Sequence, residues 1–305
     1  MFRLIAAALL APLVALSPAH AGDRQRLGYG HLITNDFLGD GQDRWRSGAV
    51  SSSRIWGPTW TGTAPAGFGE LVELRLGMAV LAPDNLRMPA VGDRPYAGTL
   101  SAGLHTHFSR QGYDISLGGD LVFTGPNTGL GSLQRAFHDL LDTTGPSSTM
   151  LDNQIGNGVH PTFVGEVGRS VDLGHNMRLR PFVEARAGAE TLLRVGADLT
   201  IGDIGQGELL IRDITTGQRY RSIQNPDLGG FSFVLGADIA HVADSIYLPE
   251  NRGFVLTDRR DRLRAGVHWQ GDGASVFYGV TWLGREFEAQ TEGQLVGSLR
   301  VNLRF

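Results

Sequence analysis

The sequence predicts an all-β fold, an antiparallel transmembrane β-barrel of about twelve strands with one short loop helix. Three observations predict it. Hydrophobic residues alternate with polar or small ones in many segments, these segments run to ten or more residues, and no run of 18 apolar residues follows the first 21 residues. Such a chain is either soluble or a barrel, because only apolar helices and closed barrels span a bilayer. In the rival fold, a secreted soluble β-sandwich, strands usually have about five or six residues, so the segment lengths favour the barrel.

The alternation is clear from Val72 onward. Val72, Leu74 and Leu76 share one face of the predicted strand, whereas Glu73 and Arg75 share the other. A period of two residues is typical of a strand with one apolar and one polar face. An even number of strands near twelve is ordinary for an outer-membrane barrel. The segments with this character are residues 24–35, 45–56, 70–81, 97–109, 112–124, 161–171, 177–188, 191–202, 208–240 (partly a long hairpin), 262–270, 275–285 and 294–305.

Composition excludes several classes of protein. The chain has no cysteine, so disulfides, cysteine nucleophiles and thiolate metal sites are excluded. With 41% hydrophobic and 19% charged residues it is too apolar for a disordered chain. Its 27 basic residues, all of them Arg, face 31 acidic residues, which gives a formal charge of -4. A nucleic-acid partner is therefore not expected, because such proteins carry a basic excess.

The first 21 residues are typical of a secretory signal peptide. Arg3 supplies the positive start, an apolar stretch follows, and residues 19–21 fit the small-x-small cleavage rule. An N-terminal anchor helix is the alternative, but the stretch is shorter than the roughly 20 residues that span a bilayer. The barrel then covers residues 22–305, in the outer membrane of a Gram-negative cell. By analogy with other outer-membrane barrels, the aromatic Phe305 would be read by the barrel assembly machinery during biogenesis.

With the N-terminus on the periplasmic side, odd-numbered connections face outward and even-numbered ones are expected to be short turns. Residues 109–112 and 172–176 fit such turns. The outward fifth connection, residues 125–161, contains the one helical pattern of the protein, predicted at about residues 130–143. Its apolar stripe is Leu133, Phe137, Leu140 and Leu141, and its adjoining polar face is Gln134, His138 and Asp142. The helix either lies against the barrel and presents His138 as a base, or is a plug or lid whose polar face meets water.

Polar residues gather on two further outward connections. The first carries Asn35 and Asp36, then residues 43–44, with Ser47 just inside the next strand. The third carries the Gly-Asp-Arg-Pro-Tyr-Ala-Gly run at residues 92–98. Three polar clusters therefore fall on three successive outward connections, and polar loops are common places for function.

At these residues the sequence resembles the outer-membrane lipid A 3'-O-deacylase family, and the order and approximate spacing of its motifs agree over residues 27–165. The resemblance implies a twelve-stranded barrel whose active site lies near the outer leaflet, between the barrel wall and the loop helix. It also implies a calcium-dependent ester hydrolysis that removes the 3'-linked acyloxyacyl group of lipid A, the lipid part of lipopolysaccharide. The matching motifs are residues 34–37, 43–47, 92–98, 124–126, Gln134 with His138, and 153–155.

Roles carry over to the matching positions of this chain. Asn35 and Asp36 match a catalytic Asn-Asp pair, Ser47 matches a catalytic Thr or Ser, and His138 matches the catalytic His, with Gln134 beside it. Two positions depart from the family pattern. Val91 stands where some members have Lys, and residues 156–158 stand where many have an Asn-Glu pair. Arg94 or Arg87 would consequently have to contact a lipid A phosphate. Arg94 is the better candidate for a bidentate contact, and a salt bridge that shapes the loop is its alternative role.

Two mechanisms are compatible with these residues. In the first, His138 removes a proton from water, Asp36 is an oxygen ligand suited to Ca²⁺, and Asn35 or backbone amides complete the oxyanion site. In the second, Ser47 is the nucleophile, His138 its base and Asn35 the partner that orients the base.

Other charged residues have structural alternatives. Asp43 and Arg44 are neighbours and could simply pair with each other. His105 and His107 share the polar face of one strand, where they could hold a metal together or merely line the lumen. Two rival functions also remain, an outer-membrane phospholipase with Ser47, His138 and Asn35, and a non-enzymatic barrel such as a pore.

Overall fold

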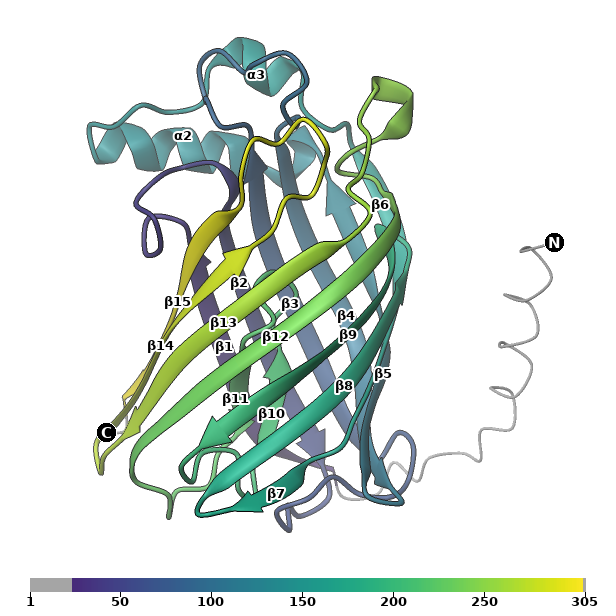
Figure 1. Ribbon diagram of the computed structural model, residues 1–305, viewed down its shortest axis with the longest axis vertical. Helices are drawn as coiled ribbons and strands as arrows, with labels where there is room; N and C mark the ends of the chain where they lie inside the picture. The colour runs from purple at the N-terminus through teal and green to yellow at the C-terminus, as the bar shows by residue number, and fades with distance from the viewer. Residues whose placement is uncertain (1–23, 304–305) are drawn as a thin grey trace, which may run out of the picture.

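Twelve long antiparallel strands form a closed barrel in the computed structural model, which describes residues 24–303 (Figure 1). Strand β6 pairs with β8 and β1 pairs with β15, and these two pairings close the wall. The fold prediction is confirmed. The wall strands are β1 (Gln25–Asn35), β2 (Trp45–Gly57), β3 (Leu71–Ala82), β4 (Ala97–Arg110), β5 (Tyr113–Thr124), β6 (Gly158–Gly168), β8 (Met177–Ala187), β9 (Glu190–Ile201), β12 (Gly230–Ser245), β13 (Arg260–Gln270), β14 (Ala274–Leu283) and β15 (Gln294–Leu303).

The predicted signal peptide and the C-terminal Phe305 lie outside the described residues. A short strand, β7 (Val171–Gly174), pairs with the start of β8. Between residues 24 and 303, no helix is long and apolar enough to cross a membrane.

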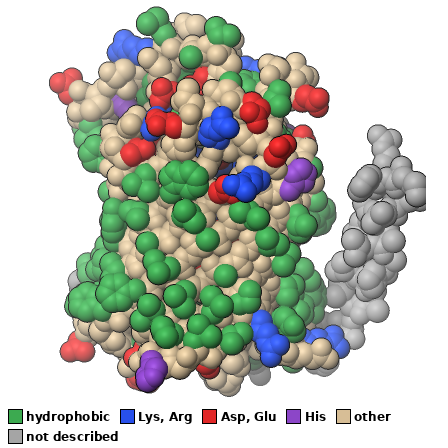
Figure 2. All heavy atoms as spheres, in the orientation of Figure 1, with side chains coloured by type: hydrophobic (Ala, Val, Ile, Leu, Met, Phe, Trp, Pro, Cys, Tyr) green, Lys and Arg blue, Asp and Glu red, His purple; other side chains and the backbone are tan. Residues whose placement is uncertain are grey.

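The two faces of the wall differ in polarity. Large apolar side chains are exposed on its outer face, for example Leu104 on β4 and Phe163 on β6. On the face seen in Figure 2, charged side chains gather toward the two ends, and hydrophobic side chains occur along the wall between them. The inner face is polar: the guanidinium of Arg264 contacts the carboxylates of Asp198 and Asp238 inside the barrel. Buried charges of this kind need partners, and the lumen supplies them in ion pairs.

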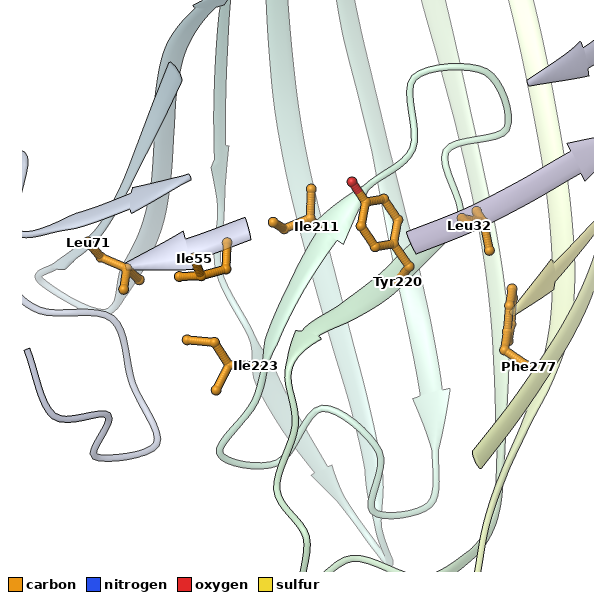
Figure 3. Packing of buried hydrophobic residues seen from close by; sticks show 7 residues of the cluster. All are labelled: Leu32, Ile55, Leu71, Ile211, Tyr220, Ile223 and Phe277. Carbon is orange, nitrogen blue, oxygen red and sulfur yellow. The ribbon is translucent and has the colours of Figure 1, made fainter. Parts of the chain in front are cut away.

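A hairpin occupies the lumen. It consists of β10 (Leu209–Arg212) and β11 (Arg219–Ile223), which pair with each other and not with the wall. Figure 3 shows its side chains Ile211, Tyr220 and Ile223 among residues of the wall, and all of these are buried. The wall residues in this cluster are Leu32, Ile55, Leu71 and Phe277. A Cβ atom at Gly28 would lie 2.0 Å from the Ser222 carbonyl oxygen, so glycine at this position lets β1 and β11 approach.

This hairpin corrects one expectation. The connection between β9 and β12 is not a short turn, because residues 202–229 fold back into the barrel. The segment predicted at residues 208–240 therefore belongs partly to the lumen hairpin and partly to wall strand β12.

Two helices cover the end of the barrel to which we refer as the loop end (Figure 1). Helix α2 (Leu130–Leu140) is the predicted loop helix, and it ends before residue 143 because Asp142 adopts a positive φ of 54°. Helix α3 (Ser148–Asp152) was not expected, and the Ser147 side chain caps it by accepting from Met150 N. Short 3₁₀ turns, η2 (Pro126–Thr128) and η3 (Glu250–Arg252), lie in the same end connections.

Candidate active site

The candidate site lies at the loop end, on the outer side of the wall. In β1, Leu32 and Thr34 are buried, and Thr34 bonds to Ser298 inside the barrel. Because side chains alternate along a strand, Asn35 points outward like Ile33, which is 46% exposed. Asn35 is the last residue of β1, so its side chain lies at the loop end of this strand.

Helix α2 reaches this position because small residues allow it to approach the wall. A Cβ at Gly98 in β4 would lie 2.8 Å from Thr128 Oγ1 and 2.9 Å from Leu130 Cβ. Real side chains do not tolerate such contacts, so glycine admits the start of α2 against the outer face of β4. One turn separates Gln134 from His138 on this helix. Both side chains therefore face the first connection together.

Asp43 joins the helix to the barrel. Its Oδ2 lies 2.7 Å from Nε2 of His138, and its Oδ1 accepts a hydrogen bond from Ser47 Oγ. Gln134 Nε2 lies 3.4 Å from Asp43 Oδ1 and 3.5 Å from Ser47 Oγ. The structure thus brings three predicted site residues, Ser47, Gln134 and His138, together around Asp43. The expected helix with His138 and Gln134 side by side against the wall agrees with this geometry.

The second ring nitrogen of His138 also has a partner. Thr143 Oγ1 lies 2.9 Å from Nδ1, and the Thr143 backbone N–H donates to the carbonyl oxygen of His138. An ionised carboxylate only accepts hydrogen bonds, so Nε2 carries the proton toward Asp43. Nδ1 is then the nitrogen with a free electron pair, and the Thr143 hydroxyl donates to it.

Asn35 holds the backbone rather than the imidazole. Its Nδ2 donates to the Ser47 carbonyl oxygen at 2.9 Å, and its Oδ1 accepts from Phe37 N at 2.9 Å. In the serine mechanism, Asn35 was expected to orient His138. That position is taken by Asp43, so this part of the expectation is wrong.

Asp36 is a buried carboxyl group in negatively charged surroundings. Its Oδ2 accepts from Arg44 N at 2.7 Å and its Oδ1 from Phe37 N at 2.9 Å. Burial, together with the nearby carboxylates of Asp43 and Asp40, raises the pKa of Asp36 to about 8, against the opposing effect of the two backbone N–H groups. A cation beside Asp36 would relieve both effects.

A calcium ion therefore fits the charge of this position, whereas the side-chain donor set is small. Within the described residues, no group of three or more Asp, Glu or His side chains is placed to hold a metal. Asp36 is the residue that would hold Ca²⁺, and the remaining ligands would have to be backbone carbonyls, waters or substrate oxygens, all of which Ca²⁺ accepts.

The expected pair between Asp43 and Arg44 does not form. Arg44 Nη1 lies 2.7 Å from Glu292 Oε1 and its Nη2 lies 3.4 Å from Asp40 Oδ2. Its guanidinium also lies over the Trp45 ring, 4.3 Å from the ring centroid. Asp43 is left free to contact His138. Asp43 and Thr143 are thus the residues that sequence reasoning missed, although Asp43 lies in one of the recognised motifs.

Arg94 lies inside the barrel, away from this cluster. Its Nη1 pairs with Glu286 Oε2 at 3.0 Å, and Arg46 Nε pairs with Glu286 Oε1 at 2.6 Å. Arg94 is 1% exposed, so its geometry agrees with the salt bridge that shapes the loop. The guanidinium is not accessible to a lipid phosphate, so the expected phosphate contact of Arg94 is wrong.

His105 and His107 do not share a metal position. His105 Nε2 lies 2.9 Å from Asp120 Oδ1, whereas His107 Nε2 lies 2.7 Å from Glu73 Oε2. Both side chains are buried in separate ion-paired groups of the lumen. They line the interior, which was the alternative expectation.

A closed antiparallel barrel with an apolar outer wall, a polar lumen and a histidine–carboxylate cluster at its loop end defines a β-barrel membrane protein with an enzyme-like site at its rim. The family described as "Outer membrane protein LpxR" matches residues 4–305, so the chain belongs to this outer-membrane family. The family expected from the motifs is confirmed.

Among solved structures, LpxR from Salmonella typhimurium is similar with a TM-score of 0.74 at 17% identity, over 91% of this chain and 100% of that chain. The beta domain of the Bordetella autotransporter BrkA gives a TM-score of 0.42 at 12% identity, over 91% of this chain and 99% of that chain. A comparison with curated protein sequences finds no match. At these identities the structural likeness concerns the fold alone.

Proposed function

We propose that this protein is an outer-membrane hydrolase that removes the 3'-linked acyloxyacyl group of lipid A by calcium-assisted ester hydrolysis. Family membership supports a lipid A-modifying enzyme of the outer membrane. The observation that carries the proposed chemistry is the contact between His138 and Asp43 on the outer side of the wall, beside Asn35 and Asp36. An ester bond of an outer-leaflet lipid can reach this position without entering the barrel.

His138 is the general base in this proposal. Asp43 holds the proton of Nε2 and stabilises the imidazolium that forms when Nδ1 takes a proton from water. The Thr143 hydroxyl occupies Nδ1 in the structure, and it also lies 3.4 Å from the carbonyl oxygen of His138. If the Thr143 hydroxyl group rotates so that it donates to the His138 carbonyl oxygen instead, Nδ1 is free to bind the attacking water.

The remaining residues position the reacting groups. Ca²⁺ held by Asp36 would supply Lewis-acid polarisation of the ester carbonyl. Asn35 fixes the Ser47 backbone through one amide N–H and has a second N–H with which to stabilise the developing oxyanion. The Ser47 hydroxyl group donates a hydrogen bond to Asp43 rather than to His138. This arrangement favours water over Ser47 as the nucleophile.

Two rival functions are less well supported. The β10–β11 hairpin fills part of the lumen, which disfavours an open pore. The barrel does contain a cavity of about 660 Å³ between the hairpin and the wall, but none of its lining residues belongs to the candidate site. A phospholipase would use the same residues on a different lipid, and only the product distinguishes the two enzymes.

The test is mass spectrometry of lipid A and of phospholipid after incubation with the purified, folded protein, with and without Ca²⁺. We expect loss of one acyloxyacyl unit from lipid A only with Ca²⁺ and only with His138 present. The His138→Ala protein is the control. Release of fatty acid from phospholipid with lipid A unchanged would favour the phospholipase, and no change in any lipid would overturn the enzymatic proposal.

A further inference from the structure

Helix α2 carries an apolar face that is exposed along most of its length. Phe137 is 58% exposed and Leu140 is 80% exposed, and Leu133 and Leu141 on the same face are exposed as well. The expectation for such a stripe in a water-soluble protein is burial against the core. In this structure the stripe begins against the barrel and then continues without a partner among the described residues.

The first residue of the stripe fixes the direction of this face. Leu130 is 4% exposed and meets the outward side of Gly98 on β4. On an ideal helix Leu130 lies within the sector spanned by Leu133, Phe137 and Leu141. The face that contacts the outer wall at Leu130 is therefore the face that is exposed farther along α2. In Figure 1 the helix crosses the loop end and extends beyond the outline of the wall.

The depth of the helix follows from the same contact. Leu100, the next outward residue of β4 after Gly98, is exposed on the lipid-facing side of the wall, as is Leu104. Two residues of a strand span roughly 7 Å. The start of α2 thus lies one outward position above the apolar outer surface of β4, and its apolar face is continuous with that surface.

Neighbouring connections of the loop end add exposed apolar groups. Phe37 follows β1 and is 75% exposed, and Met88 and Val91 between β3 and β4 are exposed too. Exposed apolar patches of this extent mark interaction surfaces. The opposite side of α2 is different, because Ser132 and Asp139 are exposed polar residues there.

We propose that the apolar face of α2, formed by Leu133, Phe137, Leu140 and Leu141, is immersed among the acyl chains of the surrounding outer leaflet, as in an interfacial amphipathic helix. The occupant of this face is lipid hydrocarbon. The proposal rests on the barrel, its outer wall and the contact at Leu130, and not on the proposed reaction. It adds that Gln134 and His138, beside the apolar face, are held at the depth where acyl chains join their polar headgroup.

Because the chain has no cysteine, single cysteines can carry a nitroxide label without background. We would label Phe137→Cys and Leu140→Cys on the apolar face, and Ser132→Cys and Asp139→Cys on the opposite face. Leu104→Cys, in the middle of the wall, is the reference for a lipid-facing site. The proteins are folded into vesicles of phospholipid alone, and power-saturation EPR compares collisions with oxygen, which partitions into hydrocarbon, and with a water-soluble nickel chelate.

We expect the oxygen-to-nickel collision ratio at positions 137 and 140 to be several-fold higher than at 132 and 139, and lower than at 104, which lies deeper in the hydrocarbon. Equal ratios on the two faces, or a high nickel accessibility at 137 and 140, would overturn the proposal. Low accessibility to both reagents, with spin–spin broadening at full labelling, would assign the face to a second copy of the chain and also overturn it. No lipid A is present, so the result is independent of whether the deacylase proposal holds, and circular dichroism identifies any variant that has not folded.

Discussion

Nε2 of His138 on helix α2 lies 2.7 Å from Oδ2 of Asp43 in the first connection of the barrel. The two residues belong to different loops, and their contact joins the helix to the rim of the wall. The same carboxylate accepts a hydrogen bond from the Ser47 hydroxyl group. Asp43 is therefore the centre of the candidate site, and a change at this residue tests the mechanism most directly.

Replacing Asp43 with Asn is expected to reduce lipid A deacylation by about 100-fold or more, as for other bases that lose an orienting carboxylate. Asn can donate as well as accept, so it no longer enforces the tautomer with the proton on Nε2. The measurement is the initial rate of acyloxyacyl release by mass spectrometry. Asp139→Asn, on the exposed side of the same helix, is the matched control and should keep its rate. Equal rates for the two variants would remove Asp43 from the mechanism.

The Ser47→Ala variant distinguishes water from serine as the nucleophile. If water attacks, we expect a moderate reduction, about tenfold or less, because Ala removes one hydrogen bond to Asp43 and no reacting atom. Intact-protein mass spectrometry during turnover should then show no acyl adduct. An adduct on the original protein that disappears with Ser47→Ala would establish the serine mechanism instead.

Chelation tests the metal. Removal of Ca²⁺ with a chelator is expected to abolish deacylation, and return of Ca²⁺ should restore it, while Mg²⁺, which demands a more regular octahedral site, should not. Asp36→Asn should bind Ca²⁺ more weakly and need higher concentrations for the same rate. Full activity of chelated original protein would exclude the calcium part of the proposal.

Gly98→Val tests how the helix is held. A Cβ at this position would lie 2.8 Å from Thr128 Oγ1 and 2.9 Å from Leu130 Cβ, so the start of α2 has to move outward. We expect activity to fall by about tenfold or more, because small displacements of a base are costly, while the circular dichroism of the barrel stays unchanged. Gly156→Ala, where an added Cβ meets open space, is the control. Activity of Gly98→Val at the level of this control would contradict the described helix contact.

Glu286 forms ion pairs with Arg46 and Arg94 inside the barrel, and their contribution to stability can be tested. Although burial favours its neutral form, Arg46, Arg94 and Arg260 hold the pKa of Glu286 well below its ordinary value of 4.5. A carboxyl group whose pKa is lower in the folded state stabilises that state at every pH above the ordinary pKa of the group. This contribution is lost as the pH falls toward and through the folded-state pKa. Glu286→Gln leaves two buried guanidinium groups without this partner and should cost about 3 kcal/mol near neutral pH.

The free energy of unfolding from urea titrations in detergent measures this effect. We expect the difference between the original protein and Glu286→Gln to be constant above about pH 5 and to shrink below it, because the protonated Glu286 resembles Gln. A difference that does not change with pH would show that the carboxylate charge is not what stabilises the loop end.

The wall of the barrel could be predicted from the sequence because its signal is local. Each strand repeats its polarity every two residues, as in Val72, Leu74 and Leu76 of β3. The lumen hairpin could not be separated from the wall on this basis. Residues of β10 and β11 are buried on both faces, since the hairpin is surrounded by the wall, and an alternating pattern does not say which sheet a strand joins.

The candidate site was predictable in its parts but not in its connections. The motifs singled out Ser47, Gln134 and His138, which the structure brings together. Asp43 and Arg44 are adjacent in the sequence, which suggested that they could pair. Successive side chains point in different directions, however, and Arg44 forms an ion pair with Glu292 instead. Contacts between two loops depend on the shape of the whole barrel end, and spacing along the chain does not contain that information.

The seam between the first and last wall strands is supported from within. Among the described residues the ladder between β1 and β15 has three paired positions, from Ile33 to Asn35. Farther down β1, strand β11 of the lumen hairpin packs closely at Gly28. The same hairpin contacts the other side of the seam, because its residues pack against Phe277 of β14 and Gln218 Nε2 donates to the Val280 carbonyl oxygen on that strand. Separation of β1 from β15 would therefore also have to break one of these interior contacts, so the hairpin opposes sideways opening of the barrel toward the lipid.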